Sequence, residues 1–343
     1  MTLELLHSVA EGRSLSEEQA EMAMRALLAG ESTPVLTAAF LTALHVKGET
    51  VEELTGFARA MRAAAVTLPL GDVCRPVLDT CGTGGNRTAG FNISTISAFV
   101  IAGAGVRVAK HGNRSITSRS GSADLLEALG VRTAVSPEIV CRSIERAGIG
   151  FLFAPSFHGA VRHVQPVRLE LKFRTAFNFL GPLTNPARAE MQVAGTWSED
   201  AAEKIAGALA RLGLRRGFVV HGDDGMGEVT VSGPSTVFSI RDGLVEKLRV
   251  APEDFGFGVR PLDTIRGGDV AYNKSVAEAV LAGELGGPRE VVAMNAGMGL
   301  VVAGRAGSWR EGAEMACASI DSGAALRALE GLRAATAADS AGV

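Results

Sequence analysis

Residues 79–95, which read DTCGTGGNRTAGFNIST, combine glycines with small polar residues directly after a short apolar stretch. Gly82, Gly84 and Gly85 fall within four positions, and the segment NIST follows at 92–95. Backbone N–H groups that converge between a strand and the N-terminus of a helix bind anions, and glycines let a phosphate approach the main chain. The segment is neither a Walker A sequence nor GxGxxG, so a tight turn with a polar cap is the alternative interpretation.

A second polar loop, KHGNRSITSRSGS, occupies residues 110–122. It follows the apolar stretch VRVA, so we expect Lys110 and His111 at the carboxyl end of a strand. Ligands of parallel α/β sheets bind at that edge. Two such loops at adjacent strand ends suit a ligand that carries several phosphates, whereas a basic surface loop with a serine-rich turn is the alternative.

A third stretch, residues 153–187, is rich in histidine and arginine and ends in the rigid turn GPLTNP. Its histidine and arginine side chains include His158, Arg162, His163, Arg168 and Arg174. A lone residue of either type is usually structural or solvated, but this density after a predicted strand is unusual. Because arginine binds carboxylates through two parallel hydrogen bonds, the stretch is a candidate for holding a carboxylate.

The segments that must position these loops show helix and strand patterns. Residues 1–72 contain only helical signals, including capping boxes that begin at Ser16 and Thr50. In residues 76–222, short apolar strands alternate with helices, and residues 270–332 are mainly helical. This pattern predicts an α/β protein with a small N-terminal helical domain and a large domain built on a mostly parallel sheet.

The chain of 343 residues is 47% hydrophobic and 21% charged, with a formal net charge of −3. This composition predicts a packed globular protein and argues against a surface built to bind nucleic acid or an anionic membrane. The four cysteines are scattered without a CxxC pair, which is typical of reduced thiols. No targeting segment and no apolar stretch of about 20 residues is present. We therefore expect a cytoplasmic protein without nucleic-acid or membrane partners.

The three stretches together resemble the sequence pattern of the anthranilate phosphoribosyltransferases, GTGGD…FNIST, KHGNR…SGSADLLEALG and FAPxxH…RHVxPVRxEL…RTxFNxLGPLTNPA. HGDDGMGE at residues 221–228 is similar to the family's HGxDGxDE, and the likeness covers nearly the whole chain. The resemblance implies a fold like that of nucleoside phosphorylases and phosphoribosyltransferases. A small helical domain (1–72, joined by helices around 157–188) would pack beside an α/β domain (73–343) that binds phosphoribosyl pyrophosphate (PRPP). It also implies a homodimer.

The resemblance further implies which residues bind each substrate and the metal. Anthranilate would contact Gly82, Asn113 and Arg168. A Mg²⁺ cofactor would contact Ser94 and Glu228, and the catalytic residues would be Lys110, His111 and His158. The implied PRPP contacts are Gly82, Gly85, Asn86, Asn92, Ile93, Ser94, Thr95, Lys110, His111, Gly112, Asn113, Arg114, Ser115, Ile116, Thr117, Ser118 and Ser122.

In the implied reaction, the amine of anthranilate attacks C1 of the ribose and pyrophosphate leaves. An aromatic amine is neutral at pH 7, so no strong base is needed. Catalysis then rests on positioning and on stabilisation of the leaving pyrophosphate by Mg²⁺ and Lys110. Acceptance of the amine proton by His111 or His158 is a hypothesis.

Two departures from the family pattern concern the metal. Asn86 stands where GTGGD has its carboxylate, and Gly227 replaces the first acid of the Asp-Glu pair. Carboxylates supply most of the charge in Mg²⁺ sites, so we expect weaker Mg²⁺ affinity. The chemistry should survive, because PRPP brings its own metal and Asp223 and Asp224 are close to Glu228 in sequence.

Two alternative functions stay open at this point. One is a nucleoside phosphorylase-like enzyme that binds free phosphate. The carboxylate-suited Arg168 and the GPLTNP stretch speak against it. The other is a weakly active or non-catalytic relative with an altered acceptor, including a nucleic-acid-binding one, against which the net negative charge and the PRPP signature speak.

Overall fold

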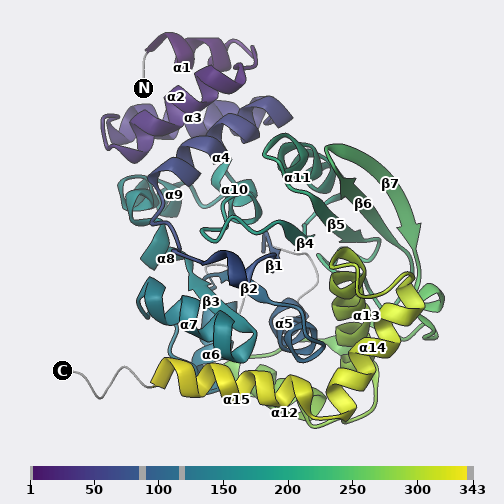
Figure 1. Cartoon of the computed structure of the whole chain (residues 1–343). Coiled ribbons are helices and arrows are strands. Elements are labelled where there is room, and N and C mark those ends of the chain that lie inside the picture. The colour runs from purple at the N-terminus through teal and green to yellow at the C-terminus, as the bar shows by residue number, and fades with distance from the viewer. Residues whose placement is uncertain (1–2, 85–89, 116–119, 338–343) are drawn as a thin grey trace.

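The computed structural model describes residues 3–84, 90–115 and 120–337. Four helices form an N-terminal bundle at one end of the molecule (Figure 1): α1 (Leu3–Ala10), α2 (Glu17–Leu28), α3 (Pro34–Lys47) and α4 (Val51–Ala64). Ser16 and Thr50 form the predicted capping boxes, and Gly48 ends α3 as expected. Local capping signals therefore set the ends of the helices in this bundle.

A seven-stranded sheet with the order β3-β2-β1-β4-β5-β6-β7 forms the centre of the larger part. The strands are β1 (Leu78–Gly82), β2 (Val108–Gly112), β3 (Ile149–Phe153), β4 (Met191–Gly195), β5 (Arg216–Gly222), β6 (Ser235–Arg241) and β7 (Leu244–Val250). Strands β1 to β5 pair in parallel, which confirms the predicted fold class. Because parallel strands end at one edge, the polar loops after β1 and β2 emerge side by side.

The sequence analysis did not anticipate the antiparallel hairpin β6–β7. Asp242 and Gly243 form its turn with φ angles of 48° and 87°, a left-handed conformation that Asp-Gly favours. Strand β7 is exposed over most of its length, so it lacks the buried apolar residues by which the other strands were recognised.

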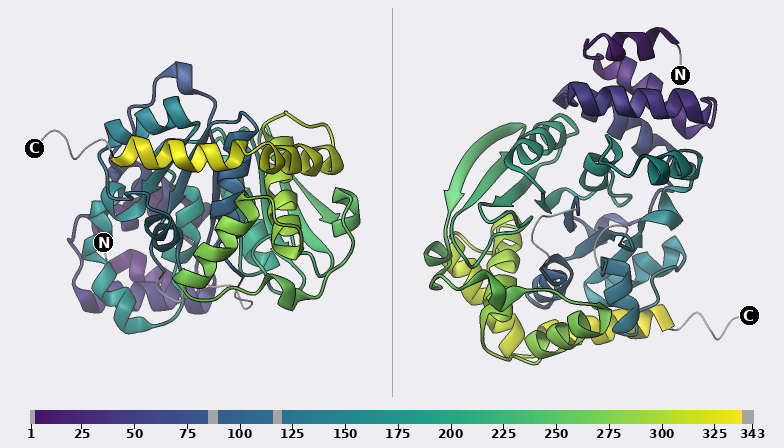
Figure 2. Two further views of the ribbon diagram at one scale, coloured as in Figure 1. Left: turned by 90° about the horizontal axis from the view of Figure 1, so that it is seen from below. Right: turned by 180° about the vertical axis from the view of Figure 1, so that it is seen from behind.

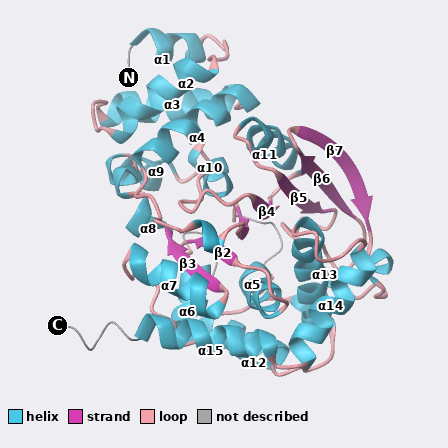
Figure 3. Ribbon diagram, in the orientation of Figure 1, coloured by secondary structure: helices cyan, strands magenta, loops and turns pink. Residues whose placement is uncertain are grey.

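The remaining helices cover both faces of the sheet (Figures 2 and 3). They are α5 (Ile93–Gly103), α6 (Ser122–Ala128), α7 (Pro137–Ala147), α8 (Ala154–Phe157), α9 (Gln165–Leu171), α10 (Phe177–Leu183), α11 (Glu199–Arg211), α12 (Val270–Leu281), α13 (Gly287–Val302), α14 (Trp309–Asp321) and α15 (Ala324–Ala337). One buried cluster packs helices α5, α13, α14 and α15 against one face of the sheet. A second cluster packs the N-terminal bundle, α10 and α11 against the opposite face. None of the described helices combines the length and apolar character needed to cross a bilayer.

The chain returns to the N-terminal bundle between residues 154 and 187. Helix α9 contacts α3, the 3₁₀-helix Gly159–His163 contacts α2, and α10 contacts α4. The segment that the resemblance assigned to the helical domain therefore packs against it. The exact domain boundary at residue 72 stays a prediction.

Candidate active site

Lys110, near the carboxyl end of β2, is buried beside the first turn of α5. Its Nζ donates to the carbonyl oxygen of Thr80 and lies 3.4 Å from Oγ of Ser94. Burial lowers the pKa of Lys110, and the negative charges of Asp79 and Glu228 oppose that shift. The cation thus lies at the N-terminus of a helix, where the helix dipole also favours a bound anion.

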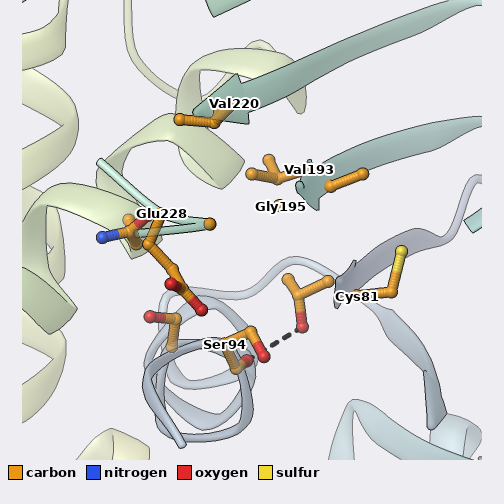
Figure 4. Close-up of a pocket in the computed structure, with 11 residues that line it drawn as sticks. Cys81, Ser94, Val193, Gly195, Val220 and Glu228 are labelled. Atoms are coloured by element: carbon orange, nitrogen blue, oxygen red, sulfur yellow. Dashed lines mark hydrogen bonds between the residues drawn. The ribbon is translucent and has the colours of Figure 1, made fainter. Parts of the chain in front are cut away.

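Ser94 and Glu228 line one pocket, beside the carboxyl ends of β1, β4 and β5. Their side chains point toward each other across this space (Figure 4). Burial raises the pKa of Glu228 to about 7, although the Lys110 charge acts in the opposite direction. A carboxylate and a hydroxyl are the oxygen ligands that Mg²⁺ accepts together with substrate phosphates. The pair therefore fits the expected metal-binding role.

The two other acids of this segment are engaged by different partners. Oδ1 of Asp223 accepts from Nη1 of Arg249 at 2.8 Å, and Oδ2 of Asp224 accepts from Oγ of Ser232 at 2.6 Å. In the described ranges, no group of three His, Cys, Asp or Glu side chains gathers as a metal site. Glu228 is therefore the acid that faces Ser94, and the expected support from Asp223 and Asp224 is weakened by their other bonds.

The first polar loop starts where β1 pairs with β4. Gly82 ends β1 opposite Gly195 and is exposed at the sheet edge. Gly84 has a φ of 66°, in the left-handed region that favours glycine. Two predicted PRPP contacts, Gly85 and Asn86, lie outside the described residues. The described part of the loop presents main chain rather than side chains, as an anion-binding loop requires.

Asp124 joins the two described parts of the second polar loop. Oδ2 of Asp124 accepts from the backbone N–H of Ser115 at 3.1 Å and from that of Gly121 at 2.8 Å. A Cβ at position 121 would lie 2.3 Å from the backbone nitrogen of Ser115, so only glycine fits there. Three predicted PRPP contacts lie outside the described residues: Ile116, Thr117 and Ser118.

The other described residues of this loop that were predicted to bind PRPP differ in the contacts that they already make. Gly112 lies close to Ser122, because a Cβ on Gly112 would be 3.0 Å from that of Ser122. The carbonyl of Asn113 accepts from the main chain at the start of α6. Arg114 is half exposed, and its Nη2 lies 2.6 Å from Oε1 of Glu127. A phosphate bound by Arg114 would compete with this acid.

Asn92, predicted to bind PRPP, links the two loops in this structure. Its Nδ2 donates to the carbonyl of Ser120 at 3.2 Å, and its Oδ1 accepts from the Ser120 hydroxyl and from Nδ2 of Asn273, each at 3.1 Å. These bonds use most of the amide's capacity. Ile93 and Thr95 are 1% exposed, and the Thr95 hydroxyl has no partner within the described part of the chain.

His111 and His158 form a buried pair on the other face of the sheet. Nδ1 of His111 lies 3.2 Å from the carbonyl oxygen of Gly181, which can only accept, so Nδ1 carries the hydrogen and Nε2 keeps its lone pair. The two rings are 5.2 Å apart. Burial lowers the pKa of His111 to about 3 and that of His158 to about 4, so both are neutral at pH 7. Nε2 of His111 lacks a partner among the residues described.

Arg168 lies in α9 with its guanidinium over the ring of Phe177, 5.0 Å from the ring centroid. Its Nη1 donates to Oε1 of Gln165 at 3.1 Å, and burial lowers its pKa. Phe177 begins α10, and the carbonyl of Gly181 in the same helix accepts from His111. Helix α10 therefore connects Arg168 with the histidine pair.

The alternation of side chains along β2 divides the predicted site into two halves. Successive residues of a strand point to opposite faces. Lys110 therefore joins Ser94 on the face covered by α5, and His111 joins His158 on the face covered by α10. Gly82 lies at the strand edge between the two halves.

The sequence analysis missed Asp79, which is fully buried on the His111 face. Its Oδ1 accepts from the backbone N–H of His111 at 2.9 Å, and its Oδ2 has no partner within the described ranges. Burial raises the pKa of Asp79. A single acid inside an otherwise apolar strand is a signal that could have identified it, because acids are rarely buried without a reason.

The chain matches the glycosyl transferase family in both of its parts. Residues 3–65 match its helical bundle domain, and residues 74–326 match its a/b domain. A relative from Solibacter usitatus named anthranilate phosphoribosyltransferase is 52% identical over 327 residues, which cover 95% of this chain and 96% of that protein.

Solved structures agree over the full length. The anthranilate phosphoribosyltransferase of Thermus thermophilus matches with a TM-score of 0.91 and 45% identity, covering 97% of this chain and 99% of that one. The Saccharomyces cerevisiae enzyme in complex with PRPP and Mg matches with a TM-score of 0.90 and 28% identity, covering 98% of each chain. The yeast enzyme has also been solved with 4-fluoroanthranilate, with a TM-score of 0.86, 27% identity and 98% of each chain covered.

Proposed function

The chain belongs to the anthranilate phosphoribosyltransferase family, and we propose that it transfers the phosphoribosyl group of PRPP to the amine of anthranilate. The products are N-(5-phosphoribosyl)anthranilate and pyrophosphate, in tryptophan biosynthesis. The observation that carries this proposal is the division of one sheet edge into a cationic phosphate half at Lys110 and a neutral histidine half at His111. A reaction between a phosphorylated sugar and an uncharged aromatic amine needs both halves side by side.

PRPP is proposed to bind along the two polar loops. The backbone at Gly82 and the N-terminus of α5 supply N–H groups, and Lys110 supplies the positive charge. Asn92 keeps the loops together through its bonds to Ser120. The remaining assigned PRPP contacts in these loops stay part of the proposal.

Mg²⁺ is proposed as the cofactor, and Ser94 and Glu228 would hold it. When bound, it would neutralise charge on the leaving pyrophosphate. The yeast relative solved with PRPP and Mg supports this cofactor. Lys110 contributes a second positive charge close to the same place, and it costs no reorganisation because it is already buried there.

Anthranilate is proposed to bind on the α10 face. Arg168 lacks an acid partner within the described ranges and would receive the carboxylate. Asn113 and Gly82 stay part of the proposal as further anthranilate contacts. The lone pair on Nε2 of His111 would then orient the amine and accept its proton after attack on C1. His158 lies against the same ring and keeps this part of the site neutral.

A homodimer through the helical bundle is proposed as the assembly. Val35 and Val46 are 77% and 81% exposed and lie eleven residues apart on α3, which places them on one stripe of that helix. Leu3 and Met22 of the same bundle are also more than half exposed. Exposed apolar residues gathered on one domain mark an interaction surface.

The cytoplasm is proposed as the compartment in which the enzyme works. All four cysteines are free, two of them buried, which suits a reducing environment.

The decisive experiment follows the fluorescence of anthranilate during incubation with PRPP across a Mg²⁺ titration. We expect consumption of anthranilate that depends on both PRPP and Mg²⁺ and releases pyrophosphate. Activity with inorganic phosphate and thymidine but none with PRPP would instead establish the phosphorylase alternative. PRPP binding without turnover of anthranilate would indicate a relative with an altered acceptor.

A further inference from the structure

Three consecutive backbone carbonyls at the end of α10 accept hydrogen bonds from three side chains far apart in sequence. The carbonyl of Gly181 accepts from Nδ1 of His111 at 3.2 Å, and that of Pro182 accepts from Nε2 of Gln192 at 2.7 Å. The carbonyl of Leu183 accepts from Nε of Arg62 at 2.6 Å. The last carbonyls of a helix lack the usual partner within it. The carbonyl of Gly181 also accepts from the backbone N–H of Thr184 at 3.4 Å, whereas those of Pro182 and Leu183 belong to buried residues and are paired by the two side chains.

The three donors come from different parts of the fold. His111 lies in β2, Gln192 lies in β4, and Arg62 lies in α4 of the N-terminal bundle. Helix α10 is thus fixed from the sheet by two side chains and from the bundle by the third. The apolar side chains of α10 pack in the buried cluster that joins the bundle to the sheet, and the three hydrogen bonds fix the position of its C-terminal end.

Gln192 and Arg62 are buried deeply enough that their bonds matter. Gln192 is 3% exposed, and its Nε2 also lies 2.9 Å from Sγ of Cys81. Arg62 has no acid partner within the described ranges; it binds the Leu183 carbonyl and lies 3.4 Å from the carbonyl of Leu212 at the end of α11. Burial lowers the pKa of Arg62 to about 10. Two helix C-termini therefore stabilise this cation in place of a carboxylate.

Helix α10 carries the contacts that orient the acceptor half of the site. Phe177 at its start supports the Arg168 guanidinium, and the Gly181 carbonyl near its end fixes the tautomer of His111. Gly181 is exposed, and a Cβ placed on it would meet no atom within 4 Å, so the helix borders open space next to His111. Movement of α10 would displace both acceptor-side residues together and leave Lys110 and Ser94, on the other face, unchanged.

We propose that Gln192 and Arg62 are positioning residues for the aromatic acceptor, which act by holding the Pro182 and Leu183 carbonyls and thereby the whole of α10. Neither side chain needs to touch a substrate. This inference rests on the proposed function, because it assigns to α10 the orientation of Arg168 and His111 toward anthranilate.

The test compares Gln192→Met, which keeps the length of the side chain and removes its N–H donor, with Ser319→Ala. Ser319 is a matched control because its buried hydroxyl also donates to a backbone carbonyl, that of Val100, on the opposite face of the sheet. For Gln192→Met we expect the KM for anthranilate to rise about tenfold, with the KM for PRPP changed less than about twofold. The control should lose thermal stability and keep both KM values.

Variants of Arg62, which lies in the N-terminal bundle, provide a second and independent test. Arg62→Met should raise the KM for anthranilate in the same way, and Arg62→Lys should recover part of the loss, because an ammonium can still donate to one carbonyl. If Gln192→Met fails to fold, the comparison of Arg62→Met with Arg62→Lys tests the positioning role by itself. Calorimetric titration with PRPP and Mg²⁺ should show unchanged PRPP affinity in all folded variants.

The outcomes separate this inference from the proposed function. A wild-type enzyme that consumes no anthranilate would overturn the function itself. An active wild type whose Gln192 and Arg62 variants change both KM values equally, or neither, would overturn only the positioning role. Equal effects of Arg62→Lys and Arg62→Met would also count against it.

Discussion

Lys110 and His111 are adjacent in β2, yet their side chains lie on opposite faces of the sheet. Lys110 reaches Ser94 at the start of α5, and His111 reaches Gly181 in α10. A single peptide bond thus links the phosphate half of the site to the acceptor half. The strand sets the separation of these two residues, whereas the contacts that each side chain makes depend on the helix packed against its own face.

The first prediction concerns the phosphate half. Lys110→Met keeps the volume of the side chain and removes its charge, so stabilisation of the leaving pyrophosphate should be lost. We expect kcat to fall by about a hundredfold or more, with the KM for anthranilate nearly unchanged. Steady-state kinetics with each substrate varied in turn measures both. Lys247→Met, an exposed lysine in β7, is the control and should behave as wild type; a Lys110 variant with normal kcat would refute the assignment.

The second prediction concerns the acceptor half. Arg168→Met should raise the KM for anthranilate by about tenfold to a hundredfold, because a charged hydrogen bond to a carboxylate contributes about 1.5–3 kcal/mol. Arg168→Lys should recover little, since an ammonium cannot form two parallel bonds. The KM for PRPP should stay constant. Aniline, which lacks the carboxylate, gives a second measure. If replacing anthranilate by aniline lowers the rate by the same factor in wild type and in the Arg168 variant, Arg168 does not bind the carboxylate.

The third prediction concerns pH. Unfolded histidine has a pKa near 6.5, whereas His111 and His158 titrate only at about 3 and about 4 in the folded protein. Below pH 6.5 the unfolded chain therefore binds more protons, and the stability conferred by the two neutral rings is lost as the pH falls toward 4. Each ring should steepen the dependence of the unfolding free energy on pH by up to about 1.4 kcal/mol per pH unit.

Urea unfolding of wild type and a His111→Asn/His158→Asn double variant between pH 7 and pH 5 measures this slope. The titratable groups that act on His111 are His158 beside its ring, Asp79, which accepts from its backbone N–H, and the charge of Lys110 on the opposite face of the sheet. Asp79 has a raised pKa and so acts in the opposite sense, but it is common to both proteins. Identical slopes for the two proteins would show that the histidines are not held neutral.

The sequence predicted those parts of the fold that rest on local signals. Ser16 and Thr50 begin helices because capping is local, and the parallel strands appear as short apolar runs. The β6–β7 hairpin was missed although Asp242-Gly243 is a local turn signal, because exposed β7 offers no apolar pattern to go with it. Boundaries and strand pairing beyond such signals depend on the packing of distant elements.

The sequence predicted the loops of the site and, through the resemblance, a role for several of their residues, but not the contacts that position them. Lys110 and Ser94 were expected together and do lie together. The bonds of Asn92 to Ser120, 28 residues away, were not anticipated, and its contact with PRPP stays a prediction. Gln192 and Arg62 carry no local pattern, because their partners are carbonyls in α10 that only the folded chain brings near.

The fourth prediction concerns assembly. A Val35→Glu/Val46→Glu double variant places two charges on the exposed stripe of α3, so the proposed dimer should dissociate. Light scattering after gel filtration should give twice the monomer mass for wild type and the monomer mass for the variant. Leu285→Glu introduces a charge at an apolar residue that is 82% exposed outside the bundle, and it should leave the mass unchanged. A wild-type monomer at micromolar concentration would contradict the dimer.

The fifth prediction concerns the metal. Gly227 and Glu228 line the same pocket as Ser94. The backbone is closely packed at this point, because a Cβ built on Gly195 would lie 1.8 Å from the carbonyl oxygen of Gly227. A carboxylate added by Gly227→Asp should therefore lower the Mg²⁺ concentration for half-maximal turnover, by roughly tenfold, because ligand charge sets Mg²⁺ affinity. Glu228→Gln should shift it in the opposite direction.

Gly227→Asn is the matched control for that prediction, because it adds nearly the same volume without the charge. Turnover at saturating PRPP and anthranilate, measured against free Mg²⁺, distinguishes the variants. If the Asp and Asn variants share the Mg²⁺ dependence of wild type, the missing carboxylate at 227 has no bearing on metal affinity. If both shift equally, the backbone near Gly195 has moved, and the effect is one of shape rather than of charge.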